Sequence, residues 1–356
     1  MSRVVVDCHM VAQPRAGDAG NARYAAALVT AMAATAGAGD DVAALVSYPV
    51  DGELGGAATA GVPAANLRRV LRSGPRALAA LGADAAVFTY VAPPRPPCPV
   101  LVAVHDTSFI TNPEWLRPRA RAMLRALVPR AARRARLVLA LSETAKADVS
   151  AALGILPERV RVVSPPPGSA FAPGDRGEAA RRVAARFGIE RYLLAVGDVS
   201  PRKNLEALGE AVRRVGHPGL ELVFVGRVGP GGEQILRAAG ARWLGRLGDE
   251  DLADLYRAAA ATVQPSLYEG FGLTVLEALA CGSPVVASRR GATPEVAGDA
   301  AILVEPDAAS IAEGLRAALE PATAARLAAA GPHQAARYRP EGMGRAAWAA
   351  VREATG

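Results

Sequence analysis

Cysteine is scarce in this chain, and its scarcity argues against a disulfide-stabilised fold. The three cysteines, Cys8, Cys98 and Cys281, lie far apart and lack the spacing of a metal site. We therefore expect a reduced, cytoplasmic protein. Long apolar runs are missing as well, since none approaches the roughly 18 residues that a membrane-spanning helix needs. The opening segment 1–7 is short and is interrupted by Asp7, which predicts a buried first strand and not a signal peptide.

Lysine and aromatic residues are also few. Lys146 and Lys203 are the only lysines among 41 Lys and Arg residues, and aromatic residues make up 4% of the chain. Together with the abundance of alanine, this preference for arginine is typical of a GC-rich genome. The formal net charge is +7. Stacking aromatics do not accompany the arginines, so we do not expect a nucleic acid as a partner.

Eight of the arginines nevertheless fall within segment 117–136, interleaved with Met123, Leu124, Leu127 and Val128. They are Arg117, Arg119, Arg121, Arg125, Arg130, Arg133, Arg134 and Arg136. Two interpretations are open. A basic amphipathic helix can lie on an anionic membrane surface, which would place the protein at the inner face of the membrane. The same pattern can also be the solvated face of an ordinary helix.

At 356 residues the chain is too long for one ordinary core, so two domains are expected. Short β-rich runs alternate with longer Ala/Leu/Arg stretches, which predicts parallel sheets covered by helices on both faces. The predicted strands are 4–6, 42–47, 85–90, 100–105, 137–141, 160–163, 192–196, 220–225, 262–264, 284–287 and 301–303. The predicted helices are 22–35, 119–135, 142–153, 205–215, 251–260, 273–280 and 308–319.

These two series of strands predict an α/β protein with two doubly wound, Rossmann-like domains that face each other across a cleft. The proline-rich segment 164–168 continues neither a helix nor a sheet easily, so we place the boundary there and predict domains 1–168 and 169–338. In open parallel sheets ligands bind beyond the carboxyl ends of the strands. The cleft between the domains is therefore the expected site.

Segment 266–277 carries the strongest functional signal. Glu269 and Glu277 lie eight residues apart, and the loop Gly270-Phe271-Gly272 between them leads into an apolar helix that begins at Leu273. The first amides of that helix have no internal partner and attract a phosphate. Glu277 would lie about one turn inside the helix, with its side chain leaning back toward this end. The alternative is that Glu277 only complements the helix dipole.

A second signal is the segment 197–204, which follows a predicted strand and precedes a helix. Arg202 and Lys203 place two positive charges at the start of that helix, where the dipole disfavours them. A bound anion explains this arrangement better than a structural role does. Arginine can hold phosphate oxygens with two hydrogen bonds, and lysine acts as a compact charge.

The first domain offers weaker signals. The loop with Gly17 and Gly20 joins the first strand to the first helix and suits a close approach to phosphate, but it lacks the G-x-G-x-x-G pattern of a dinucleotide site. His105 ends a strand, where it is either functional or structural. The acidic triplet 249–251 opens a helix, so we expect helix capping and no metal there. A pole for phosphate with Glu269 and Glu277 as acceptors for hydroxyls suits a nucleotide sugar, and the charge of its leaving diphosphate would then be stabilised by Arg202, Lys203 and helix amides.

Taken together, the motifs resemble family 4 retaining glycosyltransferases of the GT-B fold, over nearly the whole chain. The E-x7-E pair with its glycine loop is the most specific match; the others are segments 104–109, 112–115, 141–144, 196–204 and 224–226. The resemblance implies that the first domain binds the acceptor and the second the nucleotide sugar. It also implies that the last helix, 339–356, crosses back to the first domain.

The resemblance further implies roles for individual residues. Glu269 would contact the transferred sugar and Glu277 the ribose, while His105 would lie near the reacting face of the sugar. Arg202 and Lys203 would hold the diphosphate. The remaining implied contacts are Gly17 and Gly20 in a closing loop, Gly226, Arg246 and Leu247 around the base, and Gly270, Phe271, Gly272 and Leu273 beside the phosphates.

The family resemblance predicts a metal-independent, retaining hexosyltransferase with no cofactor besides its donor, a nucleoside-diphosphate sugar. Many members have Arg after the strand glycine where this chain has Asp198, a subgroup feature that leaves the donor open. The pattern around His105 and 201–204 resembles mannosyltransferases that use GDP-mannose, with a UDP-sugar next. The hydroxyl acceptor could belong to a glycan, a glycolipid or a metabolite. Alternatives are a sugar-nucleotide epimerase or hydrolase, and a non-catalytic nucleotide-binding module.

Overall fold

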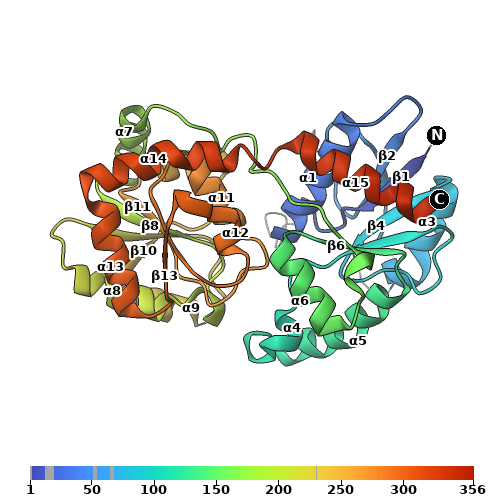
Figure 1. The fold of residues 1–356 in the computed structure, drawn as a ribbon, viewed down its shortest axis with the longest axis horizontal. Coiled ribbons are helices and arrows are strands. Elements are labelled where there is room, and N and C mark those ends of the chain that lie inside the picture. The colour runs from blue at the N-terminus through green and yellow to red at the C-terminus, as the bar shows by residue number, and fades with distance from the viewer. Residues whose placement is uncertain (1, 13–19, 51–53, 65–67, 230) are drawn as a thin grey trace. The chain divides into compact units, whose positions relative to one another are not determined.

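The computed structural model describes residues 2–356 apart from 13–19, 51–53, 65–67 and 230, and it divides into two compact units (Figure 1). Unit 1 comprises Met1–Pro166 together with Tyr338–Gly356, and unit 2 comprises Pro167–Arg337. The division falls inside the proline-rich segment 164–168. None of the helices in the described part of the chain is long and apolar enough to cross a membrane.

Unit 1 is built on a parallel sheet of seven strands in the order β3-β2-β1-β4-β5-β6-β7. In its register Val5 lies opposite Ala43 on one side and Ala86 on the other. The middle residues of the inner strands are hydrophobic on both faces, because both faces of the sheet are covered. The strands are β1 (Arg3–Asp7), β2 (Asp41–Val46), β3 (Ala58–Gly61), β4 (Ala85–Thr89), β5 (Val100–Ala103), β6 (Leu137–Ala140) and β7 (Val160–Val162).

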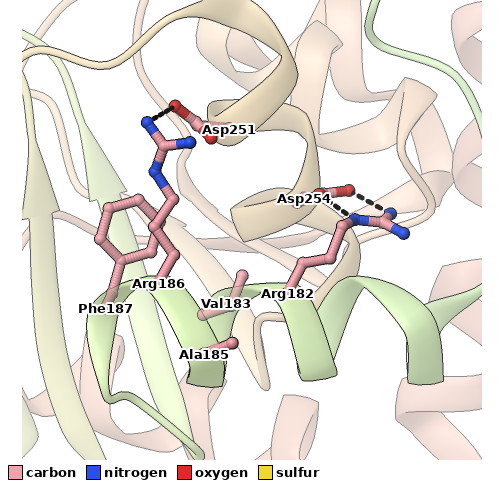
Figure 2. A pocket seen from close by; sticks show the side chains of 7 residues that line it. All are labelled: Arg182, Val183, Ala185, Arg186, Phe187, Asp251 and Asp254. Carbon is pink, nitrogen blue, oxygen red and sulfur yellow. Dashed lines mark hydrogen bonds and ion pairs between the residues drawn. The ribbon is translucent and has the colours of Figure 1, made fainter.

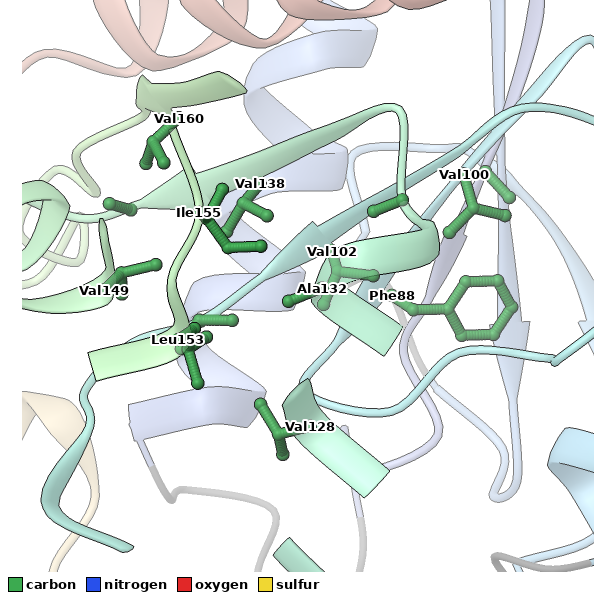
Figure 3. Packing of buried hydrophobic residues seen from close by; sticks show 14 of the residues in the cluster. Phe88, Val100, Val102, Val128, Ala132, Val138, Val149, Leu153, Ile155 and Val160 are labelled. Carbon is green, nitrogen blue, oxygen red and sulfur yellow. The ribbon is translucent and has the colours of Figure 1, made fainter. Parts of the chain in front are cut away.

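One face of this sheet packs against α5 and α6. Val128 of α5 and Val149 of α6 are fully buried against Val102 and Val138 of the sheet (Figure 3). The helices and helical turns of this part of unit 1 are Arg69–Ser73 (a π-helical turn), α3 (Gly74–Ala80), α4 (Ser108–Thr111), Pro113–Trp115, α5 (Pro118–Arg134), α6 (Glu143–Leu153) and Pro157–Arg159.

Two helices from distant parts of the chain, α1 (Gly20–Ala34) and α15 (Pro340–Thr355), pack against each other in unit 1. Trp348 is buried and its indole Nε1 donates to the carbonyl of Met32 at 2.9 Å. A Cβ at Gly344 would lie 2.3 Å from the carbonyl oxygen of Ala31, so only glycine allows this close contact. The last helix therefore belongs to the first unit.

Unit 2 is built on a second parallel sheet, of six strands in the order β10-β9-β8-β11-β12-β13. These strands are β8 (Tyr192–Val196), β9 (Glu221–Val225), β10 (Ala241–Trp243), β11 (Ala261–Gln264), β12 (Val285–Ser288) and β13 (Ile302–Val304). Helices lie on both sides of this sheet as well (Figure 1). Both sheets thus have the doubly wound α/β arrangement that the sequence predicts.

Helices cover the second sheet and contribute to its hydrophobic core. Leu208 of α8, Leu236 of α9 and Leu315 of α13 pack on one face of the sheet. The helices and turns are α7 (Arg176–Phe187), Pro201–Lys203, α8 (Leu205–Val215), α9 (Gly232–Ala238), α10 (Asp249–Ala258), α11 (Leu273–Ala280), α12 (Thr293–Ala297), Gly298–Ala300, α13 (Ala308–Leu319) and α14 (Pro321–Ala335).

Several elements were not predicted from the sequence: the strands β3 and β10, and the helices α3, α4, α7, α9, α12 and α14. The strands β3 and β10 lie at sheet edges and are short and largely exposed, so they carry little hydrophobic pattern. Helix α7 begins where we expected the connector to continue, because the side chain of Asp175 accepts the amide of Glu178 at 2.7 Å and caps it.

Candidate active site

The glycine loop 270–272 leads directly into α11, which has the bounds predicted from the sequence. Gly272 precedes the helix with a φ of 99°, and its carbonyl accepts the amides of Val275 and Leu276 at 3.0 Å. The amides of Leu273 and Thr274 have no partner in the described part of the chain. This end of α11 therefore presents N–H groups and the positive end of the helix dipole to an anion.

Glu269 lies just before this loop and is the centre of a buried ionic cluster. Its Oε1 accepts hydrogen bonds from Lys203 Nζ and from Gln264 Nε2, both at 2.8 Å. Its Oε2 lies 2.5 Å from Arg202 Nη1, which also donates to the carbonyl of Tyr268 at 2.9 Å. Arg202 and Lys203, which we predicted to hold phosphate, therefore form ion pairs with Glu269, which the family resemblance places at the sugar.

The charges of this cluster stabilise one another. Burial alone would raise the pKa of Glu269, but the charges of Arg202 and Lys203 outweigh it and lower that pKa to about 2. Burial lowers the pKa of Lys203, and the ionised Glu269 opposes this by favouring the ammonium form. Two cations face one carboxylate here, so the cluster has a positive charge in excess that an incoming anion can balance.

The segment that carries both cations is held by Asn204. This residue adopts a left-handed conformation (φ 54°), and its Nδ2 donates to the carbonyls of Pro265 at 3.1 Å and Pro306 at 2.7 Å. The amide of Leu267 donates to the carbonyl of Arg202 at 2.8 Å. These bonds fix the turn Pro201–Lys203 against the ends of β11 and β13, so the cations do not have to be ordered by the ligand.

Two glycines let backbones approach at the same edge of the sheet. A Cβ on Gly226 would lie 1.8 Å from the carbonyl oxygen of Gly197, and a Cβ on Gly291 would lie 2.2 Å from that of Glu269. Both residues also have positive φ, at 145° and 57°. Gly226, predicted beside the base, therefore also packs the end of β9 against that of β8. Gly291 and Gln264 were not predicted, since isolated glycines and amides give no signal in one sequence.

Glu277 lies in α11, about one turn from its start, and is buried with 2% of its surface exposed. The hydroxyl of Tyr256, from α10, donates to its Oε2 at 3.3 Å. A carboxylate buried with a tyrosine partner is more than a surface complement to the helix dipole. The position agrees with the predicted one, and its role toward a ribose stays a prediction.

Asp198, which stands where many family members have arginine, forms an ion pair with Arg227, the residue after Gly226. Its carboxylate accepts from Arg227, with Nε at 3.0 Å and Nη2 on the second oxygen. Arg246 is exposed and Leu247 half-buried in the loop between β10 and α10, and the amide of Gly226 donates to the carbonyl of Gly245 at 2.9 Å. The predicted base-binding residues therefore lie at the carboxyl end of β9.

His105 follows β5 in unit 1, where it is buried among aromatic rings. Its ring centroid lies 4.6 Å from that of Tyr24 and 5.4 Å from that of Tyr90. Burial lowers the pKa of His105 to about 3, and its Nε2 has no hydrogen-bond partner in the described structure. Asp106 bonds the backbone amide and hydroxyl of Ser108 instead. The imidazole is therefore neutral, with one ring nitrogen that has no partner among the described residues.

A buried ion pair in unit 1 was not predicted from the sequence. Asp7 ends β1 and forms a buried ion pair with Arg69, while His9 Nδ1 lies 3.2 Å from Asp7 Oδ1. In an arginine-rich chain nothing in the sequence distinguishes Arg69, and only its burial in the structure shows that it is a partner of Asp7. Of the predicted loop residues, Gly17 lies outside the described residues, and Gly20 is the first residue of α1.

The acidic triplet was predicted to cap α10, and this prediction is wrong. Gly248 is the cap residue, and Asp249, Glu250 and Asp251 form the first helical turn, where they complement the dipole. Asp251 pairs with Arg186 at 2.9 Å beside a surface pocket of about 410 Å³ between α7 and α10 (Figure 2). That pocket contains none of the predicted site residues. No group of three or more His, Cys, Asp or Glu in the described segments could hold a metal.

Two doubly wound units in one chain are the domains of a GT-B glycosyltransferase fold, and the cluster of Arg202, Lys203 and Glu269 lies at the carboxyl edge of the second sheet. Two family models match the chain: Glycosyltransferase Family 4 over residues 6–166 and Glycosyl transferases group 1 over residues 190–321. The chain belongs to these family 4, group 1 glycosyltransferases.

Individual relatives agree with this assignment. The chain is 32% identical over 219 residues to the O-antigen chain mannosyltransferase B of Escherichia coli, covering 57% of this chain and 56% of that protein. It spans about half the length of the first curated relatives that it matches. Among solved structures, a sucrose-phosphate synthase from Thermosynechococcus elongatus has a TM-score of 0.78 at 21% identity, covering 99% of this chain and 98% of that one. Anabaena HepE in complex with UDP and glucose has a TM-score of 0.76 at 16% identity, covering 99% and 100%.

Proposed function

We propose that this protein is a hexosyltransferase that moves a sugar from a nucleoside-diphosphate sugar to a hydroxyl of an acceptor. The proposal rests on the buried ion pairs of Arg202 and Lys203 with Glu269, next to the start of α11, where the amides of Leu273 and Thr274 have no partner among the described residues. Cations and helix amides are the groups that proteins use for phosphates. A donor with a diphosphate supplies the negative charge that this cluster accepts.

On the donor side, Arg202, Lys203 and the first amides of α11 stabilise the charge that develops on the leaving diphosphate. Their positions are fixed before binding by Asn204 and by Glu269, which is the condition for strong electrostatic stabilisation of a transition state. The proposed site therefore needs no metal ion for this task. Glu277 receives the ribose hydroxyls, and unit 2 is the donor-binding domain.

At the sugar, the reaction proceeds with retention of configuration. The bond from the anomeric carbon to the phosphate oxygen breaks, and the bond to the acceptor oxygen forms on the same face. The departing phosphate oxygen takes the proton of the acceptor hydroxyl, so no carboxylate nucleophile is required. Glu269 contacts the transferred sugar, and the neutral His105 of unit 1 bonds a sugar hydroxyl. Unit 1 is the acceptor-binding domain.

GDP-mannose is the favoured donor, because the pattern around His105 and 201–204 resembles mannosyltransferases that use it; a mannosyl donor also agrees with the Escherichia coli relative, a mannosyltransferase. A UDP-sugar comes next, because the HepE structure holds UDP and glucose. The acceptor belongs to the biosynthesis of a glycan, a glycolipid or a glycosylated metabolite.

A donor panel followed by product analysis tests this function. Purified protein is screened by thermal shift with GDP-, UDP-, ADP- and dTDP-sugars, and the stabilising donor is then incubated with and without a panel of hydroxyl acceptors. Glycosylated product with the donor's anomeric configuration, measured by NMR, is the expected result. Inversion would contradict the mechanism, and epimerised or fully hydrolysed donor without any acceptor would replace a transferase with an enzyme of another class on this fold.

A further inference from the structure

The positive charge of this protein is concentrated in one helix. Segment 117–136 contains eight arginines and no Asp or Glu, and nearly all of it forms α5. Without these eight, the chain has 33 basic and 34 acidic residues, so the excess charge comes from this segment alone. Seven of the eight arginines are exposed, Arg121 being half-buried.

Stabilisation of α5 explains only Arg133 and Arg134, which lie in its last turn and complement the dipole there. The helix has no side-chain cap and no acid in its first turn, so Arg119 and Arg121 face the positive end of its dipole. Arg121 and Arg125, and likewise Arg130 and Arg134, are like charges four residues apart, which repel. None of the eight forms an ion pair with another residue that the structure describes.

On two other helices an exposed arginine has an acidic partner. Arg214 pairs with Glu210 on α8, and Arg237 pairs with Glu233 on α9. Helices α8 and α9 therefore carry an acid one turn from an exposed arginine, whereas α5 and the residues flanking it carry eight arginines and no acid. The unbalanced face of α5 calls for an anionic partner outside the chain.

The exposed face of α5 also carries apolar side chains. Met123 and Leu127, one turn apart, are 37% and 38% exposed, while Val128 on the opposite side is fully buried in the core of unit 1 (Figure 3). Leu156, 60% exposed, precedes the turn Pro157–Arg159. That turn is tied to the end of α5, because Arg159 Nη2 donates to the carbonyls of Arg133 and Ala135.

We propose that this surface, the α5 arginine face, binds an anionic lipid bilayer. It consists of Arg119, Met123, Leu127, Arg130, Arg133, Arg134 and Leu156. With 17 residues α5 is about 25 Å long, and it would lie along the bilayer surface. The guanidinium groups bond lipid phosphates, and the three apolar side chains enter the boundary of the acyl chains. Nucleic acid fits this face less well. Met123 and Leu127 would contact charged phosphates, and the seven residues of the face include no aromatic ring on which a base could stack.

Vesicle co-sedimentation tests the proposal on the full chain. Vesicles of phosphatidylcholine with phosphatidylglycerol are compared with vesicles of phosphatidylcholine alone, near physiological ionic strength. We expect binding to the anionic vesicles only. The variant Arg119→Gln/Arg130→Gln/Arg134→Gln should bind about 100-fold more weakly, since each arginine near an anionic surface contributes about five-fold.

The matched control changes the same number of exposed arginines in unit 2, on α7, α8 and α14: Arg181→Gln/Arg213→Gln/Arg326→Gln. It should bind within about two-fold of the parent protein, because a local surface and not net charge is responsible. The variant Met123→Gln/Leu127→Gln keeps all the charge. We expect its remaining binding to disappear at about 0.5 M NaCl, where the parent retains part of its binding through apolar insertion.

Three outcomes would overturn the proposal. They are absent or equal binding to the two kinds of vesicle, an equal loss in the unit 2 control, and single-stranded nucleic acid that binds as tightly as the anionic vesicles with the same dependence on the α5 arginines. All substituted side chains are exposed, so thermal unfolding of each variant should match that of the parent. The result is independent of whether transferase activity is found.

Discussion

The carboxyl edges of the two sheets handle buried polar groups in opposite ways. In unit 2, Lys203 is buried beside an ionised acid, Glu269, which keeps the cluster charged. In unit 1, His105 is equally buried but is surrounded by the rings of Tyr24 and Tyr90, and burial lowers its pKa to about 3. Burial lowers the pKa of both Lys203 and His105. Lys203 has an ionised carboxylate beside it that favours its charged form, whereas His105 has aromatic rings around it.

This difference assigns different ligand chemistry to the two edges. The edge of unit 2 has fixed charges, with two cations around one carboxylate, which suits a ligand that is itself an anion. The edge of unit 1 has a neutral imidazole with one nitrogen that no described residue bonds, which suits a hydroxyl. Where unit 1 does bury an arginine, Arg69, its charge is balanced by Asp7.

The largest effect is expected from Glu269→Gln, which removes the charge at the centre of the unit 2 edge. Sugar transfer should fall about 1000-fold, and the free energy of unfolding by about 3 kcal/mol, because two buried cations lose their counter-ion. Added pyrophosphate should restore much of the lost stability, measured by thermal unfolding. Glu233→Gln, in an exposed pair with Arg237, is the control and should cost less than about 0.5 kcal/mol. Near-normal turnover in Glu269→Gln would remove this residue from the active site.

Gly226→Ala should destabilise unit 2 by about 3 kcal/mol, because its Cβ would overlap the carbonyl of Gly197 at a φ that other residues avoid. The measurement is urea unfolding. Gly229→Ala is the control, since nothing lies within 4 Å of a Cβ there. If both variants unfold at the same urea concentration, the close approach of β8 and β9 does not hold this edge together.

Lys203→Ala should weaken binding of a nucleoside diphosphate about 30-fold and binding of the matching nucleoside less than about three-fold, because the ammonium acts on phosphate. Isothermal titration calorimetry measures both. Lys146→Ala, the only other lysine, on α6 of unit 1, is the matched control and should change neither affinity. An equal loss for nucleoside and nucleotide would contradict the role of Lys203.

The smallest effect near neutral pH concerns the neutral edge of unit 1, and it grows as the pH falls. Because the pKa of His105 is lowered in the folded state, the unfolded chain takes up a proton below about pH 6.5 and the folded protein does not. Stability should therefore fall by up to about 1.4 kcal/mol per pH unit between about pH 6.5 and pH 3. His105→Phe, which keeps a ring between the tyrosines, should flatten this slope in thermal unfolding, whereas His333→Gln on the exposed side of α14 should not. Parallel slopes for parent and His105→Phe would show that His105 is already charged in the folded state.

Much of the fold could be predicted because the signals are local. The alternation of apolar runs and helical stretches gave both sheets, and the bounds of α11 followed from glycines on one side and an apolar run on the other. The edge strand β10 escaped because Arg242 and Trp243 are exposed and no face of the strand is hydrophobic. The capping of α10 was assigned to an acid, although Gly248 occupies the cap.

The candidate site was predicted in its residues but not in its internal contacts. The pairing of Glu269 with Lys203 joins residues 66 positions apart, so no spacing in the sequence shows it. The same holds for the rings around His105, which come from separate elements of unit 1. Residue types indicate what a site can bind, whereas the partners that set its charge depend on the three-dimensional fold.

The position of α15 in unit 1 has a consequence for how the protein is made. The ribosome releases β1 to β7 first, then the whole of unit 2, and only then α15. Unit 2 is one continuous stretch and can complete its core during synthesis. In unit 1 the surface of α1 around Met32 stays uncovered until Trp348 has left the ribosome. Unit 1 therefore begins synthesis before unit 2 but completes its packing after it.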